Sequence, residues 1–253
     1  MFRVFWLAIK DLLDELFVLM AVNALWVVLA LPLAVVGLFS VFQGAIPFGI
    51  VMILLSVLPG GPATRGLYAV AERIIDGRTA SIGHFFEGMR SDWLLSWKVY
   101  GLWTFGLVLI IVNMGFYFQW GSMLGLFLGV LFLYLLAIWL GMLIYTGPLL
   151  LLQTDKRIRL IARNALLMTM GRPVFTLVTL VMMGLVVGLS LLVRIAPFLL
   201  TFALLALWGF RATLKLIKDA EERRAALEAK AAEAAGTRAN TEQGRGGQIR
   251  PPR

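Results

Sequence analysis

Charge is confined to a few short stretches of this chain, and that confinement limits its fold more than any other feature. All 14 acidic residues and all but one of the 23 basic residues lie in four stretches. The intervals 16–64 (49 residues), 99–154 (56 residues), 173–193 and 195–210 carry no charge, and Arg194 is the exception. A charge at the centre of a bilayer costs about 2.5–3.5 kcal/mol on insertion scales. The pattern therefore predicts an all-α, polytopic membrane protein.

The uncharged intervals are long enough for six transmembrane helices. A span needs about 20 predominantly apolar residues. Short, almost uncharged turns at Gln43-Gly44 and at Gln119-Trp120-Gly121 divide the two long intervals. We therefore expect a membrane domain over 16–210 that is built as three hairpins. Its spans are expected at about 16–39, 41–58, 99–118, 122–152, 174–193 and 197–210.

The distribution of Lys and Arg predicts the orientation. Basic residues lie in the amino-terminal segment, in the loops 59–98 and 153–173, and after residue 210. Cytoplasmic loops carry the Lys/Arg excess, so both termini are expected to be cytoplasmic in a protein of the cell membrane. The even number of spans agrees. The net charge of +9 then reflects orientation and attraction to lipid headgroups. No nucleic-acid partner is expected, because the basic residues are scattered and no reading motif accompanies them.

Several segments outside the spans have helical patterns. Residues 1–15 are expected to form an interfacial amphipathic helix. Gly60-Gly61 should break the second span, with Pro62 starting a new helix that Gly77 ends and Thr79 or Ser81 capping the helix after it. The segment 211–236 carries opposite charges one turn apart and is expected to be a cytoplasmic charged helix that Gly236 stops. The tail 237–253 is expected to be disordered.

Small residues recur at helical spacing in two spans. Gly121, Gly125 and Gly129 lie four residues apart, as do Gly184 and Gly188. Such spacing lets helix backbones approach closely, either within one chain or between copies.

The residues that carry chemistry are few. The chain has one histidine, His84, and no cysteine. His84 is placed to act as a base beside Ser81 or Glu87, but that spacing is also ordinary for a helix. There is no phosphate-cradling glycine loop and no His-Glu-x-x-His pattern. We therefore predict no catalytic, cofactor-binding or metal-binding residue, and expect the protein not to be an enzyme.

The polar residues within the predicted spans are all neutral, and Asn23 is the most central of them in the first span. Asn23 is expected to hydrogen-bond a neighbouring helix, with contact to a substrate as the alternative. Ion-coupled carriers usually place ionisable groups within the membrane, so this composition disfavours proton-coupled transport.

One set of residues resembles a known family. It comprises an Asn-x-Leu-Trp helix followed by Leu-Pro, a Gly-Pro-Ala-Thr segment leading to Leu-Tyr, and a Phe-Phe segment ending in a basic residue. The set resembles the YesL-like family of bacterial integral membrane proteins over about residues 15–210. The resemblance implies a loose association with carbohydrate uptake. This chain departs from the family in having a whole apolar span between Pro32 and Gly61. The residues that carry the resemblance are Asn23, Trp26, Pro32, Gly61, Pro62, Thr64, Arg65, Tyr68, Phe85, Phe86 and Arg90.

These residues also have a structural interpretation. We expect a corner in which Thr64 bonds a local backbone carbonyl, Arg65 reaches the lipid headgroups and Tyr68 lies with the aromatic residues of 85–97. A ligand site is the alternative.

Three hypotheses for function follow. The first is a non-enzymatic, YesL-like membrane protein that is accessory or regulatory to an uptake system, with the bilayer and a transporter or other membrane protein as partners. The second is the permease subunit of an ATP-driven importer. Against it, Ala71-Glu72-Arg73 with Gly77 is a poor match to the loop that docks the ATPase. The third is an intramembrane enzyme that depends on His84.

Overall fold

A computed structural model describes residues 2–246 of the chain, with side chains described for residues 3–232. Regular structure in the described residues is helical throughout, with no strand among them. The elements in chain order are α1 (Phe2–Asp14), α2 (Leu16–Phe42), α3 (Ile46–Leu55), α4 (Val57–Ile75), α5 (Ile82–Arg90), α6 (Trp93–Gln119), α7 (Met123–Leu152), α8 (Ile158–Gly171), α9 (Pro173–Leu192), the π-helix η1 (Pro197–Thr201) and α10 (Phe202–Gly246).

Six helical segments of the described residues are long and apolar enough to cross a membrane. They confirm the predicted all-α, multi-pass architecture. The second segment consists of α3 and α4, and the sixth of η1 and the first part of α10. The segments are Leu16–Phe42, Ile46–Ile75, Trp93–Gln119, Met123–Leu152, Pro173–Leu192 and Pro197–Ala232.

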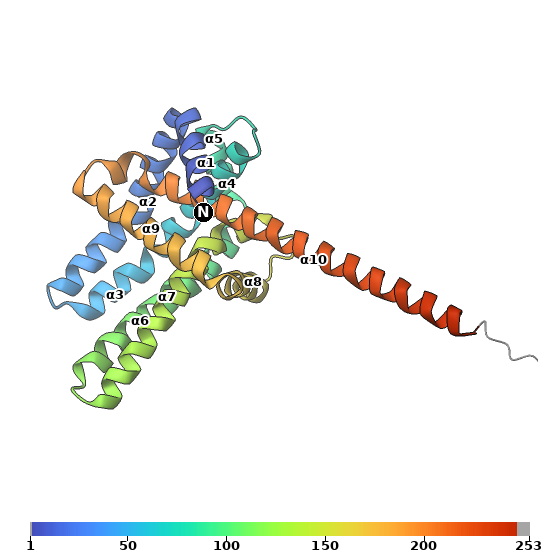
Figure 1. Ribbon diagram of the computed structural model, residues 1–253. Coiled ribbons are helices and arrows are strands. Elements are labelled where there is room, and N and C mark those ends of the chain that lie inside the picture. Colours follow the sequence, from blue (N-terminus) through green and yellow to red (C-terminus); the bar gives the residue numbers. More distant parts are fainter. Residues whose placement is uncertain (1, 247–253) are drawn as a thin grey trace, which may run out of the picture. The chain divides into compact units, whose positions relative to one another are not determined.

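The chain divides into two units, Met1–Thr213 and Leu214–Arg253. In the first unit, α2 and α3 form one hairpin and α6 and α7 form another (Figure 1). Its core is built mainly from α2, α4 and α10, and α1 contributes Val4, Ala8 and Leu12 from one face. This buried face confirms that α1 is amphipathic.

An ion pair fixes α1 to the start of α10. Arg211 donates from Nη2 to Asp11 Oδ1 at 2.6 Å, and its Nε donates to the other carboxylate oxygen. Both side chains are mostly buried, with 21% and 13% exposed. Two parallel hydrogen bonds between Arg and carboxylate are among the stronger polar contacts in proteins. Asp11 therefore faces α10, whereas Lys10 and Asp14 of α1 are exposed.

The second unit continues α10 as one helix as far as Gly246 within the described residues. Lys215–Asp219, Lys218–Glu222 and Arg224–Glu228 are paired one turn apart along it. The prediction that Gly236 ends this helix is wrong, and so is the prediction of disorder from 237 as far as 246. A glycine inside an exposed helix costs about 1 kcal/mol relative to alanine, which does not stop a helix whose neighbours favour it. Residues 247–253 lie outside the described residues.

The predicted helix start at Pro62 is also wrong. The second span bends at Ser56, which separates α3 from α4, and Pro62 lies inside α4. A proline within a helix leaves the carbonyl four residues earlier without its usual donor. For Pro62 that carbonyl belongs to Leu58, and it accepts a hydrogen bond from Trp97 Nε1 at 2.6 Å. The indole of α6 thus takes the place of the missing N–H, and α4 continues.

Asn23 has a comparable role in the sixth span. Its side chain is fully buried and donates to the carbonyl oxygens of Pro197 and Phe198, both at 2.9 Å. Its own oxygen accepts the N–H of Ala203 at 2.9 Å. Asn23 therefore holds the π-helical turn η1 from the neighbouring α2. The hydrogen bond predicted from Asn23 to another helix is confirmed.

The glycines of α7 pack within the chain. A Cβ at Gly125 would lie 2.9 Å from the Cβ of Trp120, and one at Gly129 would lie 2.8 Å from the ring of Phe118. These glycines let the α6–α7 hairpin close. Gly184 and Gly188 of α9 differ, because a Cβ at either would meet no atom within 4 Å.

Replacement of Asn23 by leucine should destabilise the protein. The variant leaves the carbonyls of Pro197 and Phe198 and the N–H of Ala203 without this partner. Each buried group left without a partner costs about 1–3 kcal/mol, so we expect a loss of about 2–4 kcal/mol in the free energy of unfolding. Unfolding by a denaturing detergent in mixed micelles, followed by circular dichroism, measures it.

Asn113→Leu is the matched control, because Asn113 is partly exposed and, among the described residues, its side chain bonds Leu109 of its own helix. Its effect should stay within about 0.5 kcal/mol. Equal effects of the two substitutions would contradict the role assigned to Asn23.

Candidate functional site

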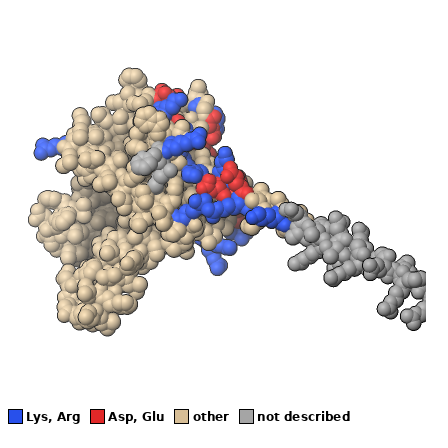
Figure 2. All heavy atoms as spheres, in the orientation of Figure 1, with Lys and Arg blue, Asp and Glu red and all other residues tan. Residues whose placement is uncertain are grey.

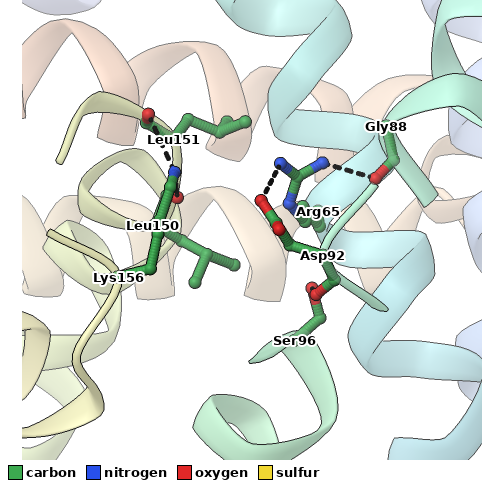
Figure 3. Close-up of polar contacts among 7 residues, drawn as sticks. All are labelled: Arg65, Gly88, Asp92, Ser96, Leu150, Leu151 and Lys156. Carbon is green, nitrogen blue, oxygen red and sulfur yellow. Dashed lines mark hydrogen bonds and ion pairs between the residues drawn. The ribbon is translucent and has the colours of Figure 1, made fainter. Parts of the chain in front are cut away.

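Arg65 of α4 is buried, with 6% of its side chain exposed. Its Nη1 donates to the carbonyl oxygen of Gly88 at the end of α5 at 2.6 Å, and its Nη2 donates to Asp92 Oδ2 at 3.1 Å (Figure 3). The prediction that Arg65 reaches the lipid headgroups is therefore wrong. The side chain lies on the buried face of α4, and its partners come from the end of α5 and from the loop after α5.

Asp92 reaches Arg65 because of an unusual backbone conformation. Its φ is +49°, in the left-handed region that aspartate tolerates better than most residues. The left-handed residue turns the chain sharply between α5 and α6, where Asp92 precedes the first residue of α6. Ser96 Oγ donates to the Asp92 carbonyl oxygen at 3.3 Å. With 44% of its side chain exposed, Asp92 lies at the edge of the protein and neutralises a buried cation.

Two glycines bring α4 and α5 into contact beside this pair. A Cβ at Gly66 would lie 2.5 Å from the carbonyl oxygen of Phe85, and a Cβ at Gly88 would lie 3.0 Å from Gly66 Cα. Larger residues would force the helices apart and move the carbonyl that accepts from Arg65. We call Arg65, Gly66, Gly88 and Asp92 the Arg65 corner.

Lys156 lies across from the Arg65–Asp92 pair in the loop after α7 (Figure 3). Its Nζ donates to the carbonyl oxygens of Leu150 and Leu151, at 2.8 and 3.4 Å, and so satisfies the end of α7. Burial lowers the pKa of Lys156; the negative charge of Asp92 raises it, the positive charge of Arg65 lowers it, and Glu72 raises it. The end of α7 therefore shares an electrostatic environment with the Arg65 corner.

A second group of motif residues connects α2 to α4. Trp26 Nε1 donates to Thr64 Oγ1 at 3.0 Å, and Thr64 Oγ1 donates to the carbonyl oxygen of Gly60 at 2.7 Å. The predicted bond from Thr64 to a local carbonyl is confirmed. The Trp26 ring also packs on Phe202, with ring centroids 4.2 Å apart.

The structure separates the other motif residues. Phe85 is fully buried under α4, whereas Phe86, Arg90 and Pro32 are exposed. Tyr68 does not join the aromatic residues of 85–97 as predicted. Its ring lies against Gly147 of α7, where a Cβ would collide with it, and a Cβ at Gly209 of α10 would lie 3.4 Å from its hydroxyl.

His84 caps its own helix. Its Nδ1 accepts the backbone N–H of Ser81 at 3.0 Å, and Ser81 is the N-cap residue of α5. The two side chains form the reciprocal arrangement of a capping box. Ser81 as the capping residue is thus confirmed.

The motif residues Trp26, Gly61, Thr64 and Tyr68 border a cavity of about 460 Å³. The cavity lies among the spanning helices α2, α4, α6, α7, α9 and α10, and apolar side chains make up most of its lining. No residue that lines it within the described part of the chain carries a charge. Its Thr and Tyr side chains offer hydrogen bonds.

Sequence reasoning missed Asp92, Lys156 and Tyr100. Tyr100 lines the cavity, and the other two face Arg65. A usable signal existed for Asp92 alone, because a carboxylate directly before an apolar span invites a search for a basic partner on a neighbouring helix.

Comparisons of the chain with protein-family models, with curated proteins and with solved structures gave no match.

Asp92→Asn tests the Arg65 corner. Asparagine tolerates the left-handed conformation and keeps the side-chain size, so the change removes mainly the charge that compensates buried Arg65. We expect a loss of about 1–2 kcal/mol in the free energy of unfolding in mixed micelles. Adding Arg65→Met should restore part of this stability, since the buried cation is then gone.

The exposed pair Arg78–Asp76 serves as the control. The double variant Arg78→Met/Asp76→Asn should change stability by less than about 1 kcal/mol. Strictly additive losses in Asp92→Asn and Arg65→Met would show that the two residues do not act together.

Proposed function

We propose that this protein is a non-catalytic membrane subunit of the YesL-like kind, which binds a transport protein through its charged end. The observation that carries the proposal is the concentration of charged residues at one end of the first unit, which we call the charged end. Apart from Arg194, the charged residues of 1–213 belong to α1, α4, α5, α8, the ends of α6 and α10 and the loops beside these helices. Figure 2 shows most of the Lys, Arg, Asp and Glu side chains of this unit gathered at one end, with one basic group apart at the left edge, while the lobes of α2–α3 and α6–α7 are free of them in this view.

The charged end has the rigidity that a docking surface needs. Arg65 joins α4 to α5 and to the residue before α6, and Arg211 joins α10 to α1. Lys156 donates a hydrogen bond to a carbonyl in the last turn of α7. Side chains fixed in this way lose little conformational entropy when a partner binds. Within this frame, α8 presents the exposed residues Arg159 and Arg163.

The resemblance of the motif residues to the YesL-like family supports a transport partner, with carbohydrate uptake as its context. The charge distribution supports a cytoplasmic location for the docking surface, since Lys and Arg concentrate on that side of membrane proteins. A second candidate, the permease subunit of an ATP-driven importer, draws support from the cavity among the spans.

The orientation can be tested by cysteine labelling, because the chain has no cysteine of its own. Gln43→Cys and Gln119→Cys place a thiol in exposed turns at the uncharged end. We expect a membrane-impermeant maleimide to label both in intact cells. Thr79→Cys, in the exposed loop between α4 and α5, should react only after permeabilisation. The reverse pattern would overturn the orientation.

Affinity capture of the full chain from native membranes in mild detergent tests the docking role. We expect the chain to retain a transport protein. Arg159→Gln/Arg163→Gln should reduce the recovery of that partner by about fivefold, as expected when charges worth about 1 kcal/mol are lost. Arg194→Gln, which removes a charge from the turn at the other end, should leave recovery unchanged.

Repeated recovery of the chain alone would contradict the docking role. Capture of an ATPase subunit whose activity the chain stimulates would favour the permease candidate instead.

A further inference from the structure

The cavity among the spans is bounded on one side by α9. Near the start of α9, Thr176 Oγ1 and the Tyr145 hydroxyl are hydrogen-bonded at 2.7 Å. Near its end, Thr201 Oγ1 donates to Ser190 Oγ at 2.9 Å. Between these points Gly184 lines the cavity, and a Cβ there would meet no atom within 4 Å. Met182, Met183 and Val186 pack against the core on one side of α9, whereas Gly184 is exposed and lies at the rim of the cavity.

Tyr100 contributes a hydroxyl group among the residues that line the cavity. It is 7% exposed and lines the cavity from α6. Its hydroxyl is buried and has no hydrogen-bond partner among the described residues. A buried hydroxyl without a partner is costly and uncommon in native proteins. An oxygen of a bound molecule would satisfy it.

The position of Tyr100 agrees with a ligand that enters from the bilayer. Tyr100 follows Trp93, the first residue of α6, by seven residues, which is about 10 Å along a helix. Trp103 and Thr104 continue the lining further along α6. The hydrogen-bonding group thus lies toward the charged end, and the apolar lining extends from it into the membrane.

We propose that this cavity binds one hydrocarbon chain of a membrane lipid, with the Tyr100 hydroxyl donating to the ester carbonyl oxygen of that lipid. A volume of about 460 Å³ lies in the range of about 300–1,000 Å³ that is usual for ligand sites. The uncharged lining excludes the phosphate headgroup from the cavity and admits the chain. The bilayer supplies this ligand directly. The site goes beyond the proposed docking role and does not depend on it.

Photocrosslinking of the full chain tests the proposal. The chain is reconstituted in vesicles of phosphatidylethanolamine and phosphatidylglycerol that contain a phosphatidylcholine with a diazirine in its acyl chain. Mass spectrometry then locates the adducts. We expect adducts on Tyr100 and Ile144, which line the cavity and are only 7% and 6% exposed, as well as on lipid-facing Leu131.

Gly184→Phe should obstruct the cavity without a clash. Adducts on Tyr100 and Ile144 should fall at least about fivefold, while those on Leu131 stay unchanged. Gly188→Phe is the matched control: its Cβ also meets no neighbour, but Gly188 does not line the cavity. The absence of adducts on Ile144 in the unmodified chain, or their equal abundance in the two variants, would overturn the proposal.

Tyr100→Phe isolates the hydrogen bond, since it keeps the shape of the side chain. In the unmodified chain, an unlabelled ester-linked lipid should compete for the Ile144 adduct more strongly than an ether-linked lipid of equal chain length. In the variant the two should compete equally. Equal competition in the unmodified chain would overturn the role of Tyr100.

Discussion

The fold depends on one constraint, that backbone polar groups within a bilayer must find hydrogen-bond partners inside the protein. Prolines lie inside the spanning helices α2, α4 and α7, and the sixth span begins with the π-helix η1. At two of these irregular points a side chain from another span supplies the missing hydrogen bonds. Trp97 donates to the carbonyl that Pro62 leaves without its helical donor, and Asn23 bonds the backbone of η1 and of Ala203. Local irregularities thus determine that α4 lies beside α6 and that the sixth span lies beside α2.

A closely packed polar site and an apolar cavity both involve the same stretch of α4. The Arg65 corner places a buried cation against a carbonyl and a carboxylate, with two glycines holding α4 on α5. Such an arrangement has few alternatives, because displacing any member leaves a buried charge without compensation. Thr64 and Tyr68 of the same helix line the cavity together with apolar residues of α9, and a Cβ at Gly184 of α9 would meet no atom within 4 Å.

The spans and the caps were predictable from sequence because their signals are local. Absence of charge over 20 residues identifies a span, and a hydroxyl residue just before the amphipathic pattern, Thr79 or Ser81, identifies a cap, which the structure places at Ser81. The burial of Arg65 could not be predicted locally, because it depends on the ion pair with Asp92, 27 residues further on, and on the left-handed backbone of Asp92. The error at Pro62 has the same origin, since the indole that lets α4 continue lies 39 residues from the carbonyl it serves. The helix continues through Gly236 because one glycine costs only about 1 kcal/mol relative to alanine.

The pairing of Pro62 with Trp97 also bears on how this sequence can change over time. Proline at 62 leaves the Leu58 carbonyl without its helical donor, and the Trp97 indole supplies one. A carbonyl oxygen has two lone pairs, so after replacement of the proline it can accept both the indole and a backbone N–H. Replacement of the tryptophan alone removes the donor that compensates for the proline. The two positions are therefore coupled in one direction, and loss of Trp97 should cost less once residue 62 is no longer proline.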